Sequence, residues 1–141
     1  MPEFSISAGR GVSDAEALAL YRSVGWAAYT RDPALLVRAI RNSSFVVTAR
    51  NAGGELVGLA RAVSDDATVC YLQDILVDPA FQRSGVGRAL LEAVQKRFGH
   101  VRQTVLLTDN EPGQRAFYQA LGFTEGGDFN PEPLRVFALF R

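Results

Sequence analysis

The chain has very few of the side chains that form covalent or metal crosslinks. Its 141 residues include one cysteine, Cys70, and one histidine, His100. A single cysteine cannot form an internal disulfide, and one thiolate with one imidazole is too few ligands for a zinc site. We therefore expect no structural metal, and we expect a reducing cytoplasm as the location of the protein.

Excess charge of one sign and long apolar runs are also missing. Fifteen Lys and Arg residues balance fifteen Asp and Glu residues, so the formal net charge is zero. Nonspecific nucleic-acid binding needs clustered positive charge, and a membrane span needs about 20 consecutive apolar residues. The sequence therefore argues against nucleic acid and membrane as partners. The first four residues also lack the basic and apolar regions of a signal peptide.

The residues that are present have the composition of an ordinary globular protein. Hydrophobic residues make up 48% of the chain and charged residues 21%. Because one domain typically holds about 100–200 residues, we expect a single domain over residues 1–141.

Helical and extended patterns alternate along the chain and predict an α/β fold with a mixed sheet. Ser13 and Glu16 form the pattern of a capping box, and Asp32 followed by Pro33 marks a second helix start. Extended segments with short turns between them predict an antiparallel meander, followed by a parallel strand–helix–strand unit. The expected strands are 4–7, 44–50, 56–63, 68–77, 103–108, 123–124 and 134–140, and the later helices are 85–98 and 112–121.

The most informative segment joins the strand at 68–77 to the helix at 85–98. Gly85 and Gly87 lack a Cβ, so a phosphate can approach the backbone closely. Free amides and the helix dipole favour an anion at that point, and Arg83 and Arg88 add positive charge. We predict that a phosphate-bearing ligand binds at the helix start. The alternative is a glycine-rich turn that only caps the helix.

Two common nucleotide-binding patterns do not fit this segment. A Walker loop needs Gly-Lys-Ser/Thr after the glycines, and the chain has none there. A dinucleotide-binding fingerprint needs Gly or Ala where Leu90 stands, and the segment follows an antiparallel meander. Both interpretations are therefore disfavoured.

The segment resembles motif A of the GCN5-related N-acetyltransferase (GNAT) superfamily. That motif is an apolar strand end with Val-x-Pro, followed by Gln/Arg-x-x-Gly-x-Gly/Ala, and it stands here as residues 76–79 and 82–87. A downstream family pattern, an aromatic pair on a helix followed by Gly-Phe, stands here as residues 117–123. The resemblance implies the GNAT fold over the whole chain.

The resemblance also implies an acetyl-CoA-dependent N-acetyltransferase, with direct attack by the amine in a ternary complex and no metal. In the family, the strand before the loop runs beside pantetheine, and the loop amides hold the pyrophosphate. Carried over to this chain, the cofactor-binding residues are Ile75, Leu76, Val77, Gln82, Arg83, Ser84, Gly85, Val86, Gly87 and Arg88.

Two catalytic residues are expected, and the resemblance supplies the first of them. Tyr118 matches the position that protonates the departing thiolate, and a phenol with a pKa of about 10 carries that proton at neutral pH. The alternative for Tyr118 is a core aromatic residue with a bonded hydroxyl. Asp74, just before the cofactor-contacting residues, is the candidate base that deprotonates the amine. Its alternative is a polar residue at a strand bulge.

The acceptor is expected to be a primary amine of a small molecule or peptide. Trp26, Tyr29 and Asp128 lie in the segments that form the acceptor pocket in the family, and Tyr71 and Gln73 share a strand with Asp74. Cys70 is disfavoured as an acyl-accepting nucleophile, because a strand cysteine usually acts as a small hydrophobe.

Other interpretations of the chain stay open. They are a non-catalytic acyl-CoA-binding or sensing module, and an acyltransferase with a longer acyl donor. The resemblance also allows a homodimer to which the last strand contributes an edge.

Overall fold

The structure is a computed structural model that describes residues 3–9 and 11–141. The chain divides into two compact units, Met1–Leu107 and Thr108–Arg141. The first unit contains the sheet, and the second contains helix α5 (Gln114–Ala120), the short 3-10 helix η2 (Gly126–Asp128) and an extended C-terminal stretch. One acetyltransferase domain over both units stays a prediction.

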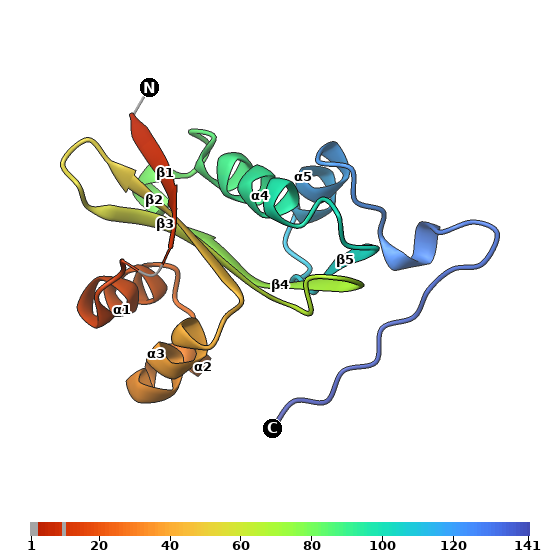
Figure 1. Ribbon diagram of the computed structural model, residues 1–141, viewed down its shortest axis with the longest axis horizontal. Helices are drawn as coiled ribbons and strands as arrows, with labels where there is room; N and C mark the ends of the chain where they lie inside the picture. Colours follow the sequence, from red (N-terminus) through yellow and green to blue (C-terminus); the bar gives the residue numbers. More distant parts are fainter. Residues whose placement is uncertain (1–2, 10) are drawn as a thin grey trace. The chain divides into compact units, whose positions relative to one another are not determined.

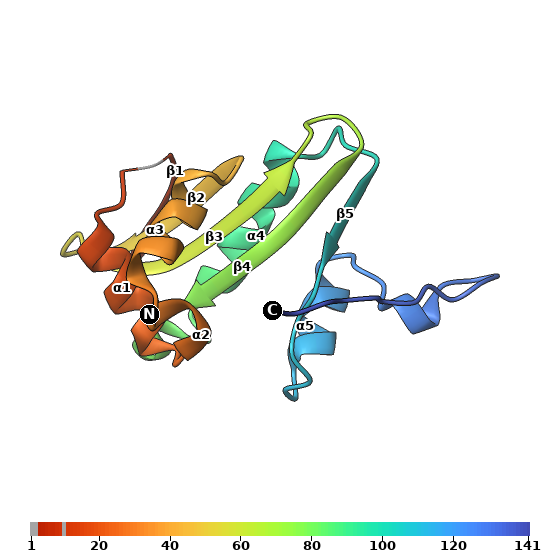
Figure 2. The same ribbon diagram turned by 90° about the horizontal axis from the view of Figure 1, so that it is seen from below.

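The first unit is built on a mixed five-stranded sheet in the order β1-β2-β3-β4-β5. Neighbouring strands are antiparallel except β4 and β5, which are parallel. Figure 2 shows these strands side by side. The mixed α/β fold expected from the sequence is therefore confirmed. The strands are β1 (Phe4–Ala8), β2 (Phe45–Asn51), β3 (Leu56–Ser64), β4 (Val69–Val77) and β5 (Gln103–Leu106).

Helices cover both faces of this sheet. Helices α1 (Asp14–Ser23), α2 (Ala27–Thr30) and α3 (Pro33–Arg41) lie on one face, and α4 (Val86–Arg97) lies on the other (Figure 1). The predicted caps are present. The Glu16 amide donates to Ser13 Oγ at 3.2 Å, and the Leu35 amide donates to Asp32 Oδ1 at 3.2 Å. The one-turn helix α2 was not expected.

Apolar side chains fill the space on each side of the sheet. On the α1–α3 side, the buried cluster includes Leu20, Leu36, Leu59 and Leu76. On the α4 side, the helix buries one apolar stripe, formed by Val86, Leu90, Leu91 and Val94. Burying each such side chain stabilises the fold by about 1.5–3 kcal/mol, so this packing fixes α4 on the sheet.

Helix α4 approaches β3 most closely at Gly58. A Cβ at this position would lie 2.8 Å from Val86 Cγ1 and 3.0 Å from Leu90 Cδ1. Val86 is the first residue of α4 and has a stiff side chain, so the helix cannot yield there easily. The missing side chain at Gly58 therefore sets how closely the start of α4 sits on the sheet.

Two strands expected near the C-terminus are absent. Residues 123–124 and 134–140 form no strand, so those predictions are wrong. An alternating apolar pattern favours an extended chain, but a strand also needs a partner for its backbone N–H and C=O groups. In the part of the chain that the structure describes, no helix is long and apolar enough to cross a membrane.

We predict that Gly58→Ala lowers the free energy of unfolding by about 1–3 kcal/mol, because the added methyl overpacks the contact between β3 and α4. Urea unfolding followed by circular dichroism measures this change. Gly53→Ala is the matched control, since a Cβ there would meet only Asn51 Oδ1 at 3.5 Å. Equal stability of the two variants would show that α4 is not held at Gly58.

Candidate active site

Strand β4 contains one extra residue relative to its neighbour β3. Arg61 pairs with Asp74 and Ala62 pairs with Leu72, which leaves Gln73 without a partner on β3. Arg61 and Ala62 are consecutive and point to opposite faces of the sheet. Leu72 and Asp74 therefore also point to opposite faces, although they are two residues apart. The bulge turns Asp74 toward the face covered by α1–α3.

Beyond the bulge, β4 separates from β5. Only residues 69–72 of β4 pair with β5 in the described structure, and Figure 2 shows the two strands diverging from there. The Asp78 amide donates to Val57 O of β3 at 2.8 Å. Because backbone groups alternate along a strand, the N–H groups of Ile75 and Val77 point to the opposite side, away from β3. They are oriented to donate to a ligand lying along β4.

The loop after β4 leads directly into the N-terminus of α4. Arg83 and Gly85 have left-handed backbone conformations, with φ of 64° and 90°. Gly85 is the N-cap of α4, and no side chain caps the helix there. The first amides of a helix have no partner within it, so the amides of residues 86–88 point out of the helix start. Together with the amides of the loop they form a set of backbone donors that suits an anion.

Local hydrogen bonds fix the shape of this loop. Asp78 Oδ1 accepts from the Ala80 amide at 2.9 Å and caps the short 3-10 helix η1 (Pro79–Phe81). Ser84 is buried and its hydroxyl donates to Phe81 O. The Arg88 guanidinium pairs with Glu92 at 2.8 Å on the surface of α4. The Arg88 side chain is thus already paired with Glu92. The backbone donors of the loop are held in place by the local hydrogen bonds before any ligand binds.

On the α1–α3 side of the bulge, Asp74 is the centre of a buried polar network. Its Oδ2 accepts from Arg61 Nε at 2.6 Å and from Tyr21 Oη at 2.9 Å, and its Oδ1 accepts from Tyr29 Oη at 2.8 Å. The side chains of Arg61 and Asp74 are 7% and 3% exposed. One carboxylate therefore joins α1, α2, β3 and β4.

The electrostatics of the network keep its donors protonated. Burial and the negative charge of Asp74 raise the pKa of Tyr21 and of Tyr29, so both hydroxyls donate at neutral pH. Burial is the largest single influence on Arg61 and would lower its pKa, but the charge and hydrogen bond of Asp74, together with the two tyrosines, outweigh burial and the pKa is raised. The Arg61 guanidinium is therefore charged beside Asp74.

Tyr29 is the outer member of this network. Its hydroxyl oxygen accepts from Gln73 Nε2 at 3.0 Å and from Arg61 Nη2 at 3.3 Å. Tyr29 is half-buried and Gln73 is exposed. The centroids of the Trp26 and Tyr29 rings lie 6.1 Å apart. Four predicted site residues, Trp26, Tyr29, Gln73 and Asp74, are thus brought together.

Sequence reasoning missed Arg61 and Tyr21. An arginine inside the otherwise apolar strand 56–63 is a signal that could have indicated a buried partner, because buried charges are almost always paired. Tyr71 lies on the same face as Asp74, since it pairs with Val63, two residues after Arg61. Cys70 is buried, and burial raises the pKa of its thiol, which agrees with a packing role.

Gln82 belongs to the first unit, where its side-chain amide donates to Val77 O at 3.3 Å. Two other predicted site residues, Tyr118 and Asp128, belong to the second unit. Tyr118 is buried in α5, where its ring packs edge-on against Phe117 and Phe123. Burial and the charge of Asp109 raise the pKa of Tyr118, so its hydroxyl is protonated at neutral pH. Asp128 already pairs with Arg115 at 2.5 Å. Its proposed contact with an acceptor amine stays a prediction.

Comparison with known proteins identifies the family. A family model described as an acetyltransferase (GNAT) domain matches residues 41–125, which is more than half of the chain. The chain belongs to the GNAT family of acetyltransferases. The match includes β4, the loop, α4 and the aromatic pair on α5, so the resemblance that these motifs suggested is confirmed.

Individual relatives agree with this assignment. This chain is 28% identical over 127 residues to an uncharacterized N-acetyltransferase, ycf52, of Pyropia yezoensis. The alignment covers 87% of this chain and 71% of the relative. It is 33% identical over 132 residues to the histone acetyltransferase TAP1 of Glycine max, covering 83% of this chain but only 54% of that protein.

A solved structure shows the same fold. A GNAT-family acetyltransferase of Streptococcus pneumoniae superposes with a TM-score of 0.81 at 26% identity, covering 96% of this chain and 98% of the other. The alignment therefore extends over nearly the full length of both chains.

Proposed function

We propose that this GNAT protein is an N-acetyltransferase that moves an acetyl group from acetyl-CoA to a primary amine of a small molecule or peptide. The supporting observation is the sequence of backbone donors along one path. The N–H groups of Ile75 and Val77 lie along the end of β4, and the amides of residues 86–88 follow at the start of α4. This order suits a ligand with an extended arm and a diphosphate.

Each group of donors has its own role in the proposed complex. The amides at the start of α4, with those of Arg83, Ser84 and Gly85, hold the pyrophosphate. The edge of β4 at residues 75–77 holds the pantetheine arm. Acetyl-CoA supplies the acetyl group as an activated thioester. A backbone N–H of β4 donates to the acetyl carbonyl and stabilises the negative charge that develops on its oxygen.

Two proton transfers complete the proposed reaction. Tyr118 donates a proton to the departing thiolate, which its raised pKa supports because the hydroxyl stays protonated at neutral pH. The acceptor amine has an ordinary pKa of about 10 and must lose a proton before it attacks. We propose that the amine replaces the exposed Gln73 amide at the Tyr29 oxygen, which accepts the amine proton while the hydroxyl proton of Tyr29 passes to Asp74.

Asp74 also has a competing, purely structural role. Three donors already occupy its carboxylate, and one of them is the Arg61 guanidinium. With these three hydrogen bonds, the carboxylate joins the elements that contact it. The relay through Tyr29 and the structural role differ in what happens when the Tyr29 hydroxyl is removed.

We predict that the protein releases CoA thiol from acetyl-CoA when an amine acceptor is present. A thiol-detecting reagent measures this release across a panel of alkylamines, aminoglycosides and lysine-containing peptides. Calorimetry with acetyl-, propionyl- and succinyl-CoA measures the donor preference in parallel. Tight acetyl-CoA binding with no thiol release from any acceptor would favour the non-catalytic module, and a preference for succinyl-CoA would favour a longer donor.

For Tyr118→Phe we predict a fall in kcat of at least about tenfold, since the acid that protonates the thiolate is lost. The affinity for acetyl-CoA should stay within about twofold, because the backbone donors are untouched. Phe117→Leu is the control for packing around α5, because the Phe117 ring contacts Tyr118 without a polar group. Wild-type kcat in Tyr118→Phe would remove Tyr118 from the mechanism.

The role of Asp74 is tested by a matched pair of variants, Tyr29→Phe and Tyr21→Phe. Each removes one hydroxyl donor from Asp74, and each should lower the free energy of unfolding by about 1 kcal/mol. Only the outer variant, Tyr29→Phe, should lower kcat, by at least about tenfold, because it interrupts the relay. Equal kcat in both variants, with stability reduced in both, would assign Asp74 the structural role.

A further inference from the structure

Three side chains beside the candidate site form an exposed apolar row on the sheet. Val63 of β3 pairs with Tyr71 of β4, and Tyr71 pairs with Val105 of β5, so these side chains lie next to one another on one face. We call them the apolar row. Val63 and Val105 are 49% and 39% exposed, and Tyr71 is partly buried. Because neighbouring strands lie about 4.8 Å apart, the row is about 10 Å wide.

The row points to the same face of the sheet as Asp74. Arg61, the partner of Asp74, and Val63 are two residues apart on β3, and alternate residues of a strand share a face. Burial and the charge of Asp74 raise the pKa of Tyr71, in agreement with their shared face. Figures 1 and 2 show α1–α3 on the β1 side of the sheet, away from β5. The row is therefore open apolar surface directly beside the network.

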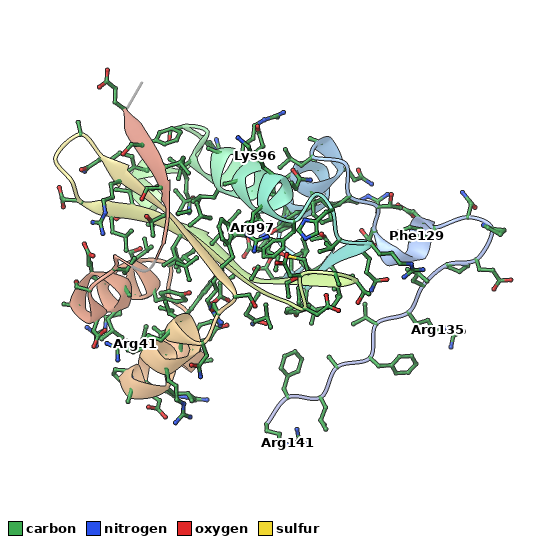
Figure 3. All side chains as sticks on the ribbon, in the orientation of Figure 1. Arg41, Lys96, Arg97, Phe129, Arg135 and Arg141 are labelled. Atoms are coloured by element: carbon green, nitrogen blue, oxygen red, sulfur yellow. The ribbon has the colours of Figure 1, made fainter. Side chains whose placement is uncertain are left out.

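The strands beneath the row carry one charge of each sign. Among the residues of β3, β4 and β5, all of which the structure describes, Asp74 is the only acidic one and Arg61 the only basic one. The two side chains form an ion pair at 2.6 Å, so their charges balance. Charged side chains labelled in Figure 3, such as Arg41 and Lys96, belong to the helices α3 and α4. The three strands therefore offer a ligand apolar surface and, among their described residues, no unpaired carboxylate.

One polar atom lies where the network meets this surface. Tyr29 Oη accepts from Gln73 Nε2 at 3.0 Å, and Gln73 is the exposed residue that the bulge leaves without a partner on β3. An exposed hydrogen bond contributes little net free energy, so a ligand amine can take the place of Gln73. Binding sites for small molecules commonly combine apolar surface with a few polar groups of this kind. Tyr29 Oη and the apolar row therefore suit the two ends of one ligand.

The spacing between these two features sets the length of the ligand. Arg61 Nη2 donates to Tyr29 Oη at 3.3 Å, and Val63 follows Arg61 by one strand repeat of about 7 Å. With bonds of about 1.5 Å, a chain of about two to four carbon atoms covers this separation. A shorter chain would hold an apolar group away from the row, and a longer chain would have to fold back on itself.

We propose that the acceptor is a monoamine in which a chain of about two to four carbon atoms joins one primary amine to one uncharged apolar group. The amine binds at Tyr29 Oη and the apolar group covers the apolar row, which removes both apolar surfaces from water. This inference rests on the proposed acetyl transfer and names its class of acceptor. Polyamines and aminoglycosides are poor acceptors, because their further ammonium groups would lose water over the row without meeting a carboxylate.

A series of phenylalkylamines tests the spacing, because its members differ only in the length of the chain between ring and amine. The series is benzylamine, phenethylamine, phenylpropylamine, phenylbutylamine and phenylhexylamine. Thiol release from acetyl-CoA gives kcat/KM for each amine, with spermidine, ethylamine and a lysine-containing peptide for comparison. We expect the highest kcat/KM within the three middle members, at least about tenfold above that of spermidine and of ethylamine.

Val105→Glu places a carboxylate on the row and should shift the preference toward polycations. The KM of phenylpropylamine should rise at least about fivefold, and the KM of spermidine should fall at least about fivefold, which a misfolded variant would not show. Leu35→Glu is the matched control, because Leu35 is an exposed apolar residue, at 49%, on α3, and it should change neither KM. Val105→Thr keeps the shape and strand preference of Val and should raise the KM of phenylpropylamine about twofold. It tests the row again if circular dichroism shows that Val105→Glu is unfolded.

Saturation-transfer nuclear magnetic resonance measures the binding of phenylpropylamine without turnover, so the two proposals can fail separately. Binding that Val105→Glu weakens, with no thiol release from any amine, would support the amine site and contradict the acetyl transfer. Equal kcat/KM for spermidine and the phenylalkylamines, or KM values unchanged by Val105→Glu, would overturn the acceptor class and leave the acetyl transfer standing. The highest kcat/KM for the lysine-containing peptide would overturn it in favour of a peptide acceptor. Neither binding nor thiol release would overturn both proposals.

Discussion

One extra residue in β4 determines how the candidate site is built. Gln73 has no partner on β3, so Asp74 turns toward α1–α3 and meets Arg61, Tyr21 and Tyr29. The pairing of β4 with β5 ends at Leu72, the residue just before Gln73. Bulges bend the strand that contains them, which accounts for the divergence of β4 from β5. The bulge at Gln73 thus accounts both for the buried Arg61–Asp74 ion pair and for the edge of β4 that does not pair with β5.

The site has a donor side and an aromatic side, and the family model covers only the first of them completely. The donor side, β4 with its loop and α4, lies within the matched residues 41–125. The aromatic residues beside the network, Trp26 and Tyr29, precede that match. The backbone of the donor side suits a ligand common to the family. The aromatic side consists of side chains from α1 and α2. We propose that acceptor choice depends on the aromatic residues beside the network, Trp26 and Tyr29.

Local features of the sequence predicted local features of the structure. Interactions within a few residues form the caps at Ser13 and Asp32 and the turn at Gly85. The local sequence is therefore enough to predict them. The network is different, because Asp74 meets Tyr21 across 53 positions of the chain. The apolar run at 134–140 predicted a strand, but the pattern does not specify a partner. The same residues form no strand.

We propose, as the central claim, that backbone N–H groups of the loop and of α4 bind the pyrophosphate of acetyl-CoA by hydrogen bonds. A crystal structure of the protein with CoA tests it most directly. We expect pyrophosphate oxygens within about 2.7–3.2 Å of the amide nitrogens of residues 86–88, with the pantetheine arm along residues 75–77 of β4. CoA bound at another surface, with no pyrophosphate contact to the start of α4, would contradict the account.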